Sequence, residues 1–522
     1  MTFETQALSL KQKIGQVLMI GFDGTTLNDH VIELIKNYHI GNVILFARNC
    51  ESPEQIFQLT KDLQKLALES NGIPLFIGID QEGGMVTRIF NQATFFPGAM
   101  TLAATGDPKN AYAMGNLMGK ELKALGINMN LAPVLDVNNN PKNPVIGVRS
   151  YSDDPQTVSR FGIEFILGLQ NHVIATAKHF PGHGDTTVDS HLGLPRVEYQ
   201  RDRLDSIELF PFKKAIEAGV HAIMSAHIQF PKLSKDSKPA TLSKTIMTDL
   251  LRSEMGFEGL IITDGMNMKA IVDHYGTEEA ALMALVAGAN QICVCHEKVS
   301  QIKAYNRLLK AFLTHEIDLN VLDERVSRVL AYKSTLNLDL DCTYASIKER
   351  VENKDHHHLA YQMVQKGVTQ VLGNPPILTP KTLFIGMLPK PVSEADDALA
   401  FSHVSQRVKT AFPFLQIEDI ALEPQEAEIE RILKIAQGAD HLILCTYNAN
   451  IYRKQLTMIQ KLLTVHPDLR VLSFRNPYDL IEIPEIRHYT CFYEYTPHAM
   501  TALLAYLNHQ FVPEGRCPIH AI

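Results

Sequence analysis

The chain alternates short, almost continuously apolar runs with longer amphipathic stretches, and this alternation limits its possible folds more than any other feature. The amphipathic stretches have helical periodicity, as in Pro53–Ser70, Lys109–Leu125 and Thr157–His172. Apolar strands that alternate with helices form parallel sheets. Eight such runs precede residue 300, and they are Val17–Phe22, Asn42–Phe46, Leu75–Ile79, Met129–Pro133, Ile174–His179, Ala222–His227, Leu260–Asp264 and Gln291–Val294.

Eight strand–helix units predict an α/β fold of the (β/α)₈ barrel type. An open doubly wound sheet is the second interpretation, but the GxGxxG sequence that opens its first helix is absent. Barrel enzymes place their active sites at the carboxyl ends of the strands. We expect a site there, because polar residues end several runs, namely Asp80, Asp136, Lys178, His179, His227 and Asp264.

The length of 522 residues exceeds what one hydrophobic core normally supports. The helical pattern Leu319–Leu336 predicts the end of a barrel catalytic domain over residues 1–340. We expect a linker over 341–360 and a smaller α/β-sandwich domain over 361–522, with strands at Thr382–Met387, His441–Cys445 and Arg470–Phe474. The triplet His356–His358 is interpreted as a solvated turn at a helix start rather than a metal site.

Composition and charge narrow the class of protein. The formal net charge is −8, so a nucleic-acid partner is not expected. The seven cysteines show no C-x-x-C spacing, and we interpret them as reduced thiols. The N-terminal residues do not resemble a signal peptide, and no run of about 20 apolar residues predicts a membrane span. These features predict a cytoplasmic enzyme that does not bind membranes.

The segment Lys178–Pro195 is the densest in chemically active residues, with three histidines and two aspartates between positions 178 and 191. One hypothesis is a metal site. Its ligands would be His179, His183, Asp185, Asp189 and His191. The other hypothesis is acid–base catalysis, in which Asp189 orients His191 and keeps it protonated.

Two further segments carry candidate residues. Asp264 follows an apolar strand, where it could act as a carboxylate nucleophile or cap the next helix. In the second segment Asp80 ends a strand and Arg88 follows eight residues later. A carboxylate and a guanidinium can bind neighbouring sugar hydroxyls, although a surface ion pair would give the same pattern.

Together these segments resemble glycoside hydrolase family 3, and within it the β-N-acetylglucosaminidase branch. The loop from Lys178 to His191 is similar to that branch's K-H-F-P-G-H-G-x(4)-D-S-H signature. Residues 262–268 (I-T-D-G-M-N-M) resemble the nucleophile strand, and residues 79–84 with Arg88 resemble the first sugar-binding segment. Residues 131–136 and 147–150 also match. The likeness is fainter after residue 340, where 475–479 and 511–518 resemble pieces of the family's second domain.

The resemblance implies a retaining exo-β-N-acetylglucosaminidase. Asp264 would be the nucleophile, and His191 would be the general acid/base, assisted by Asp189. The terminal sugar would be held by Asp80, Arg88, Arg149, Lys178 and His179. The mechanism would need no metal and no cofactor.

The implied substrates are amino-sugar glycans, such as fragments of peptidoglycan or chitin, with peptidoglycan recycling as the role. The alternatives are a family 3 β-glucosidase, a phosphorylase of N-acetylglucosaminides, a metal-dependent barrel hydrolase, or a sugar-binding protein without activity.

Overall fold

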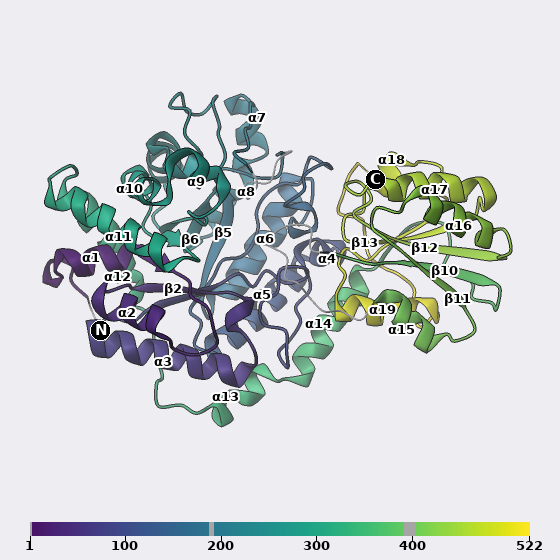
Figure 1. Cartoon of the computed structure of the whole chain (residues 1–522), viewed down its shortest axis with the longest axis horizontal. Helices are drawn as coiled ribbons and strands as arrows, with labels where there is room; N and C mark the ends of the chain where they lie inside the picture. Colours follow the sequence, from purple (N-terminus) through teal and green to yellow (C-terminus); the bar gives the residue numbers. More distant parts are fainter. Residues whose placement is uncertain (1–2, 187–192, 391–402, 522) are drawn as a thin grey trace.

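The computed structural model describes residues 3–186, 193–390 and 403–521, which form two units side by side (Figure 1). In the first unit, eight parallel strands follow one another in the order β7-β6-β5-β4-β3-β2-β1-β8. A bridge between Ile262 of β7 and Gln291, the residue before β8, brings the two ends of the sheet together and closes the barrel. The strands are β1 (Leu18–Ile20), β2 (Asn42–Leu45), β3 (Phe76–Ile79), β4 (Met129–Asn130), β5 (Ile174–Phe180), β6 (Ala222–Ser225), β7 (Leu260–Thr263) and β8 (Ile292–Val294). The predicted barrel fold is confirmed.

Helices surround the barrel, and several begin at a polar residue followed by proline. Ser52, Asp107 and Asp154 each accept a hydrogen bond from a backbone N–H of the first turn, and proline occupies the first helical position. The helices of this unit are α1 (Leu10–Val17), α2 (Asp29–Asn37), α3 (Pro53–Asn71), α4 (Ala99–Ala104), α5 (Pro108–Ala124), α6 (Pro155–Gln170), α7 (Arg201–Ser206), α8 (Leu209–Glu217), α9 (Lys269–Tyr275), α10 (Thr277–Ala287), α11 (Lys298–Leu313) and α12 (Leu319–Lys333). A π-helix, η5 (Thr245–Glu254), follows β6. Two short 3₁₀ helices, η3 (Gly147–Arg149) and η4 (Ala240–Leu242), lie in the rim loops.

The second unit is built on a six-stranded sheet in the order β11-β10-β12-β13-β14-β9. Its strands are β9 (Thr369–Leu372), β10 (Thr382–Met387), β11 (Gln416–Ile420), β12 (His441–Tyr447), β13 (Arg470–Phe474) and β14 (His488–Cys491). All neighbours are parallel except β9, which pairs antiparallel with β14. Its helices are α15 (Val404–Ala411), α16 (Glu426–Ala436), α17 (Lys454–Val465), α18 (Asp479–Glu482) and α19 (Pro497–Leu507). The expectation of an α/β second unit is confirmed.

Two helices occupy most of the segment predicted as a linker. Helix α13 (Tyr344–Val351) packs against α3 and α5 of the barrel, and α14 (Lys354–Gly367) contacts both α4 and α19. The chain therefore passes between the units as packed helix. The domain limits at 340 and 361 stay a prediction.

His356 departs from the expected solvated turn. It lies in the first turn of α14, as expected, but its side chain is buried, and its Nδ1 lies 2.8 Å from Oε1 of Glu121. The expectation of solvation was wrong because α14 packs this residue against α5, and a sequence does not show which face of a helix start meets another helix.

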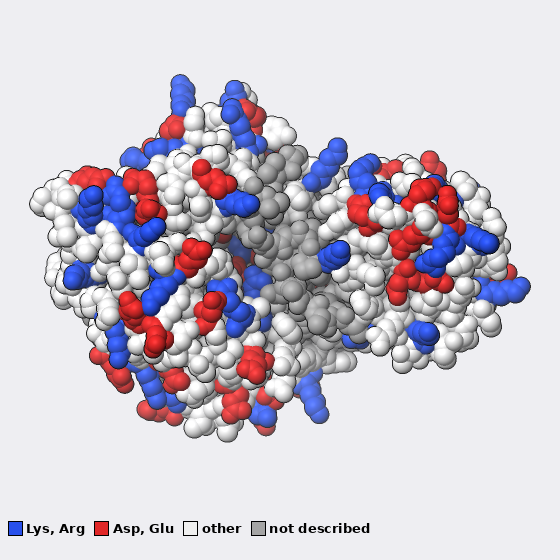
Figure 2. Space-filling model, viewed as in Figure 1, with Lys and Arg blue, Asp and Glu red and all other residues white. Residues whose placement is uncertain are grey.

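The described residues contain no candidate membrane span, and charges of both signs occur on the face seen in Figure 2. None of their helices combines the length and the apolar character that crossing a membrane requires. Figure 2 shows basic and acidic side chains interspersed over the visible face of both units.

Candidate active site

A cavity of about 370 Å³ opens at the carboxyl ends of the barrel strands. Its walls combine residues from the ends of β2, β3, β5, β7 and β8 with residues of the loop before and within η3. Six of the eight predicted site residues line it, namely Asp80, Arg88, Arg149, Lys178, His179 and Asp264. The other two, Asp189 and His191, lie outside the described residues.

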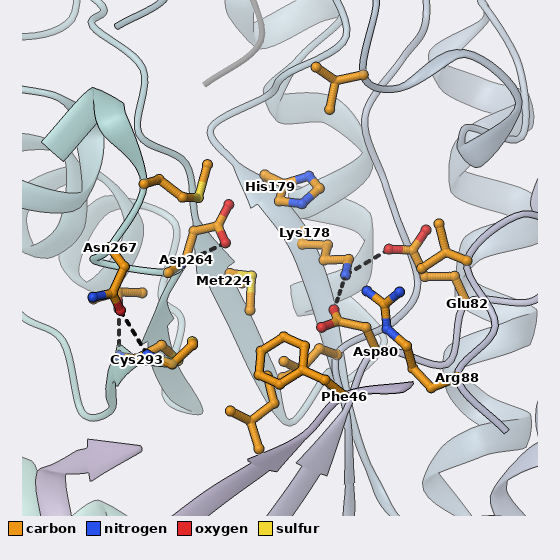
Figure 3. A pocket seen from close by; sticks show the side chains of 18 of the residues that line it. Phe46, Asp80, Glu82, Arg88, Lys178, His179, Met224, Asp264, Asn267 and Cys293 are labelled. Atoms are coloured by element: carbon orange, nitrogen blue, oxygen red, sulfur yellow. Dashed lines mark hydrogen bonds and ion pairs between the residues drawn. The ribbon is translucent and has the colours of Figure 1, made fainter. Parts of the chain in front are cut away.

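A buried ion-pair network forms one wall of the cavity (Figure 3). The ammonium of Lys178 lies 2.7 Å from Oδ1 of Asp80 and 2.7 Å from Oε1 of Glu82. Arg149 donates two hydrogen bonds to Glu82, one from Nε at 2.9 Å and one from Nη2 at 2.8 Å. Arg88 lies beside Asp80 and Glu82 in the same view. The wall thus brings three cations and two carboxylates to one side of the cavity.

Glu82 is the centre of this network, and the sequence analysis did not single it out. Burial alone would raise the pKa of Glu82, but Arg149 and Lys178 hold the pKa well below its usual range. Burial alone would likewise lower the pKa of Lys178, but Asp80 and Glu82 raise it. Both groups are therefore charged at neutral pH. Its position in the sequence could have identified Glu82, because it follows Asp80 by two residues just after a strand end.

The sequence analysis placed Asp136 at the rim without giving it a role, and the structure shows what it does. Its Oδ2 lies 2.8 Å from Nδ1 of His179, and its Oδ1 accepts a 2.6 Å hydrogen bond from the backbone N–H of His183. Burial would raise the pKa of Asp136, but His179 and His183 lower it. Because a carboxylate on Nδ1 fixes the orientation of an imidazole, Nε2 of His179 is the nitrogen that can serve a ligand.

His183 is held as a neutral ring. Burial lowers the pKa of His183 to about 4, and the neighbouring His179 adds to the effect. Its Nδ1 lies 2.8 Å from Oγ1 of Thr186. No group of three or more His, Cys, Asp or Glu side chains among the described residues is placed to hold a metal ion. That search does not include Asp189 and His191, so the absence of a metal stays a prediction.

Asp264 lies across the cavity from Asp80, Glu82 and Arg88 in Figure 3, with Lys178 and His179 between the two sides. It follows the last residue of β7, and its Oδ1 accepts a 2.7 Å hydrogen bond from the backbone N–H of Gly265. Nε2 of His227 lies 3.0 Å from the Gly265 carbonyl, and Nδ1 of His227 lies 2.9 Å from Oγ1 of Thr241. His227 therefore braces the turn that carries Asp264.

The alternative role of Asp264 as a helix cap does not hold. The next helix, α9, begins at Lys269, and the residue before it, Met268, makes no side-chain cap. Asp264 is therefore four residues too early to cap this helix. Its carboxylate belongs to the lining of the cavity instead.

The second unit reaches the back of the ion-pair wall. Oδ1 of Asn476 accepts a hydrogen bond from the backbone N–H of Val148, next to Arg149. Oε2 of the buried Glu494 accepts from the Gly98 N–H at 2.9 Å and from Thr101 Oγ1 at 2.7 Å. Gly98 packs directly on Gly84, two residues after Glu82. Both partners of the Glu82–Arg149 pair therefore stand on segments that the second unit supports.

Comparison with known proteins decides the family. Residues 9–332 match the Glycosyl hydrolase family 3 N terminal domain, which is more than half of the chain. The chain belongs to glycosyl hydrolase family 3.

Within family 3, the chain belongs to the β-N-acetylglucosaminidase branch. It is 38% identical over 403 residues to Beta-hexosaminidase A of Pseudoalteromonas piscicida, an alignment that covers 70% of this chain and 67% of that protein. It is 34% identical over 287 residues to a Beta-hexosaminidase of Nitrosomonas eutropha, covering 54% of this chain and 80% of that protein. The expectation of a glycoside hydrolase is confirmed.

The solved structures agree in both units. A family 3 beta-N-acetylglucosaminidase from Paenibacillus sp. superposes with a TM-score of 0.89 at 38% identity, covering 98% of this chain and 99% of that one. A beta-glucoside phosphorylase superposes with a TM-score of 0.82 at 23% identity, covering 99% of this chain and 95% of that one, and this likeness shows the fold alone.

Proposed function

We propose that this family 3 glycoside hydrolase is a retaining exo-β-N-acetylglucosaminidase that works through a covalent bond between the sugar and Asp264. The observation that carries the proposal is the position of Asp264, which faces a sugar-sized cavity opposite the Glu82-centred ion-pair network. A retaining glycosidase needs a nucleophile on one side of the anomeric carbon and a proton donor near the leaving oxygen. Asp264 fits the first requirement.

The charged wall is suited to bind the hydroxyl groups of one terminal sugar. Asp80 can accept hydrogen bonds from hydroxyls, and Arg88, Arg149, Lys178 and His179 can donate to them. Because Glu82 and Asp136 hold Arg149, Lys178 and His179 in place, these donors need little reorganisation when the sugar enters.

The reaction has two steps in this proposal. A carboxylate oxygen of Asp264 attacks the anomeric carbon, and the leaving oxygen takes a proton from His191. Water then gives a proton to His191 and attacks the same carbon, which releases the sugar and restores the Asp264 carboxylate. Asp189 would keep His191 oriented and charged for the first step. The relatives named as hexosaminidases support N-acetylglucosamine as the sugar. We propose peptidoglycan or chitin fragments as its source, and the cytoplasm as the location.

A panel of aryl glycosides tests the reaction. We expect hydrolysis of the aryl N-acetylglucosaminide at least about a hundredfold faster than that of the aryl glucoside, without a requirement for phosphate. A faster reaction with the glucoside would make the chain a β-glucosidase. A sugar phosphate as the product in the presence of phosphate would make it a phosphorylase. If no member of the panel is hydrolysed, the chain is a sugar-binding protein without activity.

The pair of Asp189 and His191 needs its own test, with a substrate whose leaving group depends on proton donation. His191→Ala should lose most of the turnover of such substrates and less of that of nitrophenyl substrates. Asp189→Asn removes the charge that favours the imidazolium, so the pKa of His191 should fall and the alkaline limb of kcat/KM should move to lower pH. The double variant should be little worse than His191→Ala. If the alkaline limb of kcat/KM does not move in Asp189→Asn, the two residues do not act as a pair. The same conclusion follows if the losses of the two single variants multiply in the double variant.

A further inference from the structure

Three sulfur atoms lie close together, two of them in the wall of the cavity that Asp264 also lines, and the proposed hydrolysis uses none of them. Cys293 lies within β8 and Cys295 directly follows that strand, so their side chains point to the same face. Both line the cavity, and Figure 3 labels Cys293 there. The two thiols are buried, and neither belongs to a disulfide.

The third sulfur comes from the neighbouring strand. Parallel pairing of β1 with β8 sets Met19 opposite Cys293, and Sδ of Met19 lies 3.7 Å from Sγ of Cys293. A hydrogen bond between the thiols of Cys293 and Cys295, together with burial, raises the pKa of Cys293. The two thiols are therefore near each other, and the thiol of Cys293 is protonated at neutral pH.

We propose that Cys293 and Cys295, with Met19 as the third sulfur, form a binding site for a soft divalent metal cation that blocks the active site. Thiolates and thioethers are the protein ligands that soft cations prefer. On binding, each thiol loses its proton to water and its sulfur forms a bond to the cation. Two protons leave the site and one divalent ion enters it, so the net charge of the site does not change.

This charge balance selects among cations. The dithiolate complex of a divalent ion is neutral, so it adds no net charge to a buried site near the Asp264 carboxylate. A monovalent soft ion would leave a buried negative charge there. Zinc prefers four ligands in a tetrahedron, and the proposed site supplies three. The mercuric ion, which is soft and divalent, is therefore the best probe.

The position of the site predicts inhibition. A carbon placed on the Cα of Gly265 would lie 3.8 Å from Sγ of Cys295, so an ion on the thiols sits next to the turn that carries Asp264. The backbone N–H of Cys295 also donates a 2.9 Å hydrogen bond to Oδ1 of Asn267, another residue of the cavity wall. An ion bound here occupies the space that a sugar needs in order to approach Asp264.

The test begins from a variant without the partly exposed thiols, Cys50→Ser/Cys342→Ser/Cys517→Ser, none of which lines the cavity. Mercuric chloride is added in a weakly buffered solution with excess chloride at pH 7, so that chloride and not hydroxide leaves the ion. The protons released and the aryl-glycoside activity are followed together. We expect release of two protons per chain at the first equivalent, with loss of at least about 90% of the activity. Each protein is compared with its own rate without the ion.

Variants of the three sulfurs separate the proposal from unspecific binding. Adding Cys293→Ser and Cys295→Ser to that background should abolish the two-proton release and raise the inhibitory concentration at least about a hundredfold. Met19→Leu, which nearly conserves volume, should weaken binding by roughly tenfold while both protons are still released. Zinc at the same concentration should inhibit at least about tenfold less.

Equal proton release and equal inhibition with and without Cys293 and Cys295 would overturn the proposal. So would stronger inhibition by zinc than by mercuric ion. Proton release does not depend on hydrolysis, so it reports on this site even if the proposed reaction is wrong. If the combined background does not fold, the wild type and the single variants Cys293→Ser and Cys295→Ser give the same comparison.

Discussion

The two sides of the cavity hold their charges in different ways. On one side, Glu82 is buried between Arg149 and Lys178, and the network is supported from behind by the second unit. On the other side, Asp264 is half-buried at a turn, beside thiols and a methionine. A group that must form and break a bond needs access, whereas groups that hold a sugar need fixed positions. We therefore expect substitutions on the Asp264 side to lower turnover alone, and substitutions on the Glu82 side to lower stability as well.

The largest effect is expected at Asp264. Asp264→Asn should lose at least about a thousandfold in turnover, or roughly 4 kcal/mol of transition-state stabilisation, because the amide cannot form the bond to the sugar. The melting temperature should stay close to that of the wild type. Asp273→Asn, an exposed aspartate on α9, is the matched control and should change neither property. A mechanism-based fluorosugar should label Asp264, and labelling of Asp136 instead would contradict the assignment.

Glu82→Gln should affect stability as well as activity. It removes the carboxylate that pairs with the buried Arg149 and Lys178, and breaking comparable buried pairs costs roughly 3–5 kcal/mol. Denaturant unfolding at pH 7 would measure the loss, with the exposed Glu69→Gln as control. If the variant keeps the wild-type stability and only slows turnover, the proposed difference between the two sides fails.

Glu82→Gln should also change how the free energy of unfolding depends on pH. The folded-state pKa of Glu82 lies well below the ordinary 4.5 of a glutamate, so its contribution to stability is present above that value. It is lost as pH falls toward the folded pKa, because the unfolded chain then binds the proton first. The wild type should lose stability below about pH 4.5 more steeply than Glu82→Gln. Parallel pH profiles for the two proteins would show that Glu82 does not carry the effect.

Asn476→Ala tests the support from the second unit. Without Oδ1 of Asn476, the backbone beside Arg149 loses a hydrogen bond worth about 1 kcal/mol, so KM should rise roughly fivefold while kcat stays within about twofold. Asn476→Asp keeps an acceptor and should recover most of the loss. Asn508→Ala, exposed on the same unit, is the control. A fall in kcat at unchanged KM would mean that the second unit acts on the Asp264 side.

The smallest expected effect is that of a chelator. Neither side of the cavity needs a metal ion in the proposed mechanism, so dialysis against a strong chelator should leave the rate unchanged. The proposed cation site at Cys293 and Cys295 inhibits, so removal of traces there could only raise the rate. Loss of activity that zinc restores would favour the metal-dependent hydrolase.

The sequence by itself determined the eight barrel strands, because each is a buried run with few polar residues and clear ends. In the second unit it indicated β10, β12 and β13, which lie inside the sheet, but not β11, β14 or β9. The edge strand β11 reads Gln-Ile-Glu-Asp-Ile and is half-exposed, so it lacks the apolar run that marks a buried strand. The edge strand β9 is short and pairs antiparallel.

For the site, the sequence named six residues that line the cavity. Asp80, Lys178, His179 and Asp264 were found because strand ends of a barrel converge on one rim, and the family resemblance added the roles of Arg88 and Arg149. Only the tertiary structure decided that Glu82 and Asp136 hold these residues in place, and that Asn476 and Glu494 support them from the second unit. Those roles depend on pairs such as Arg149–Glu82 and Val148–Asn476, which are 67 and 328 residues apart. A strand or a helix leaves its pattern in neighbouring residues, but an ion pair between distant segments exists only once the chain has folded.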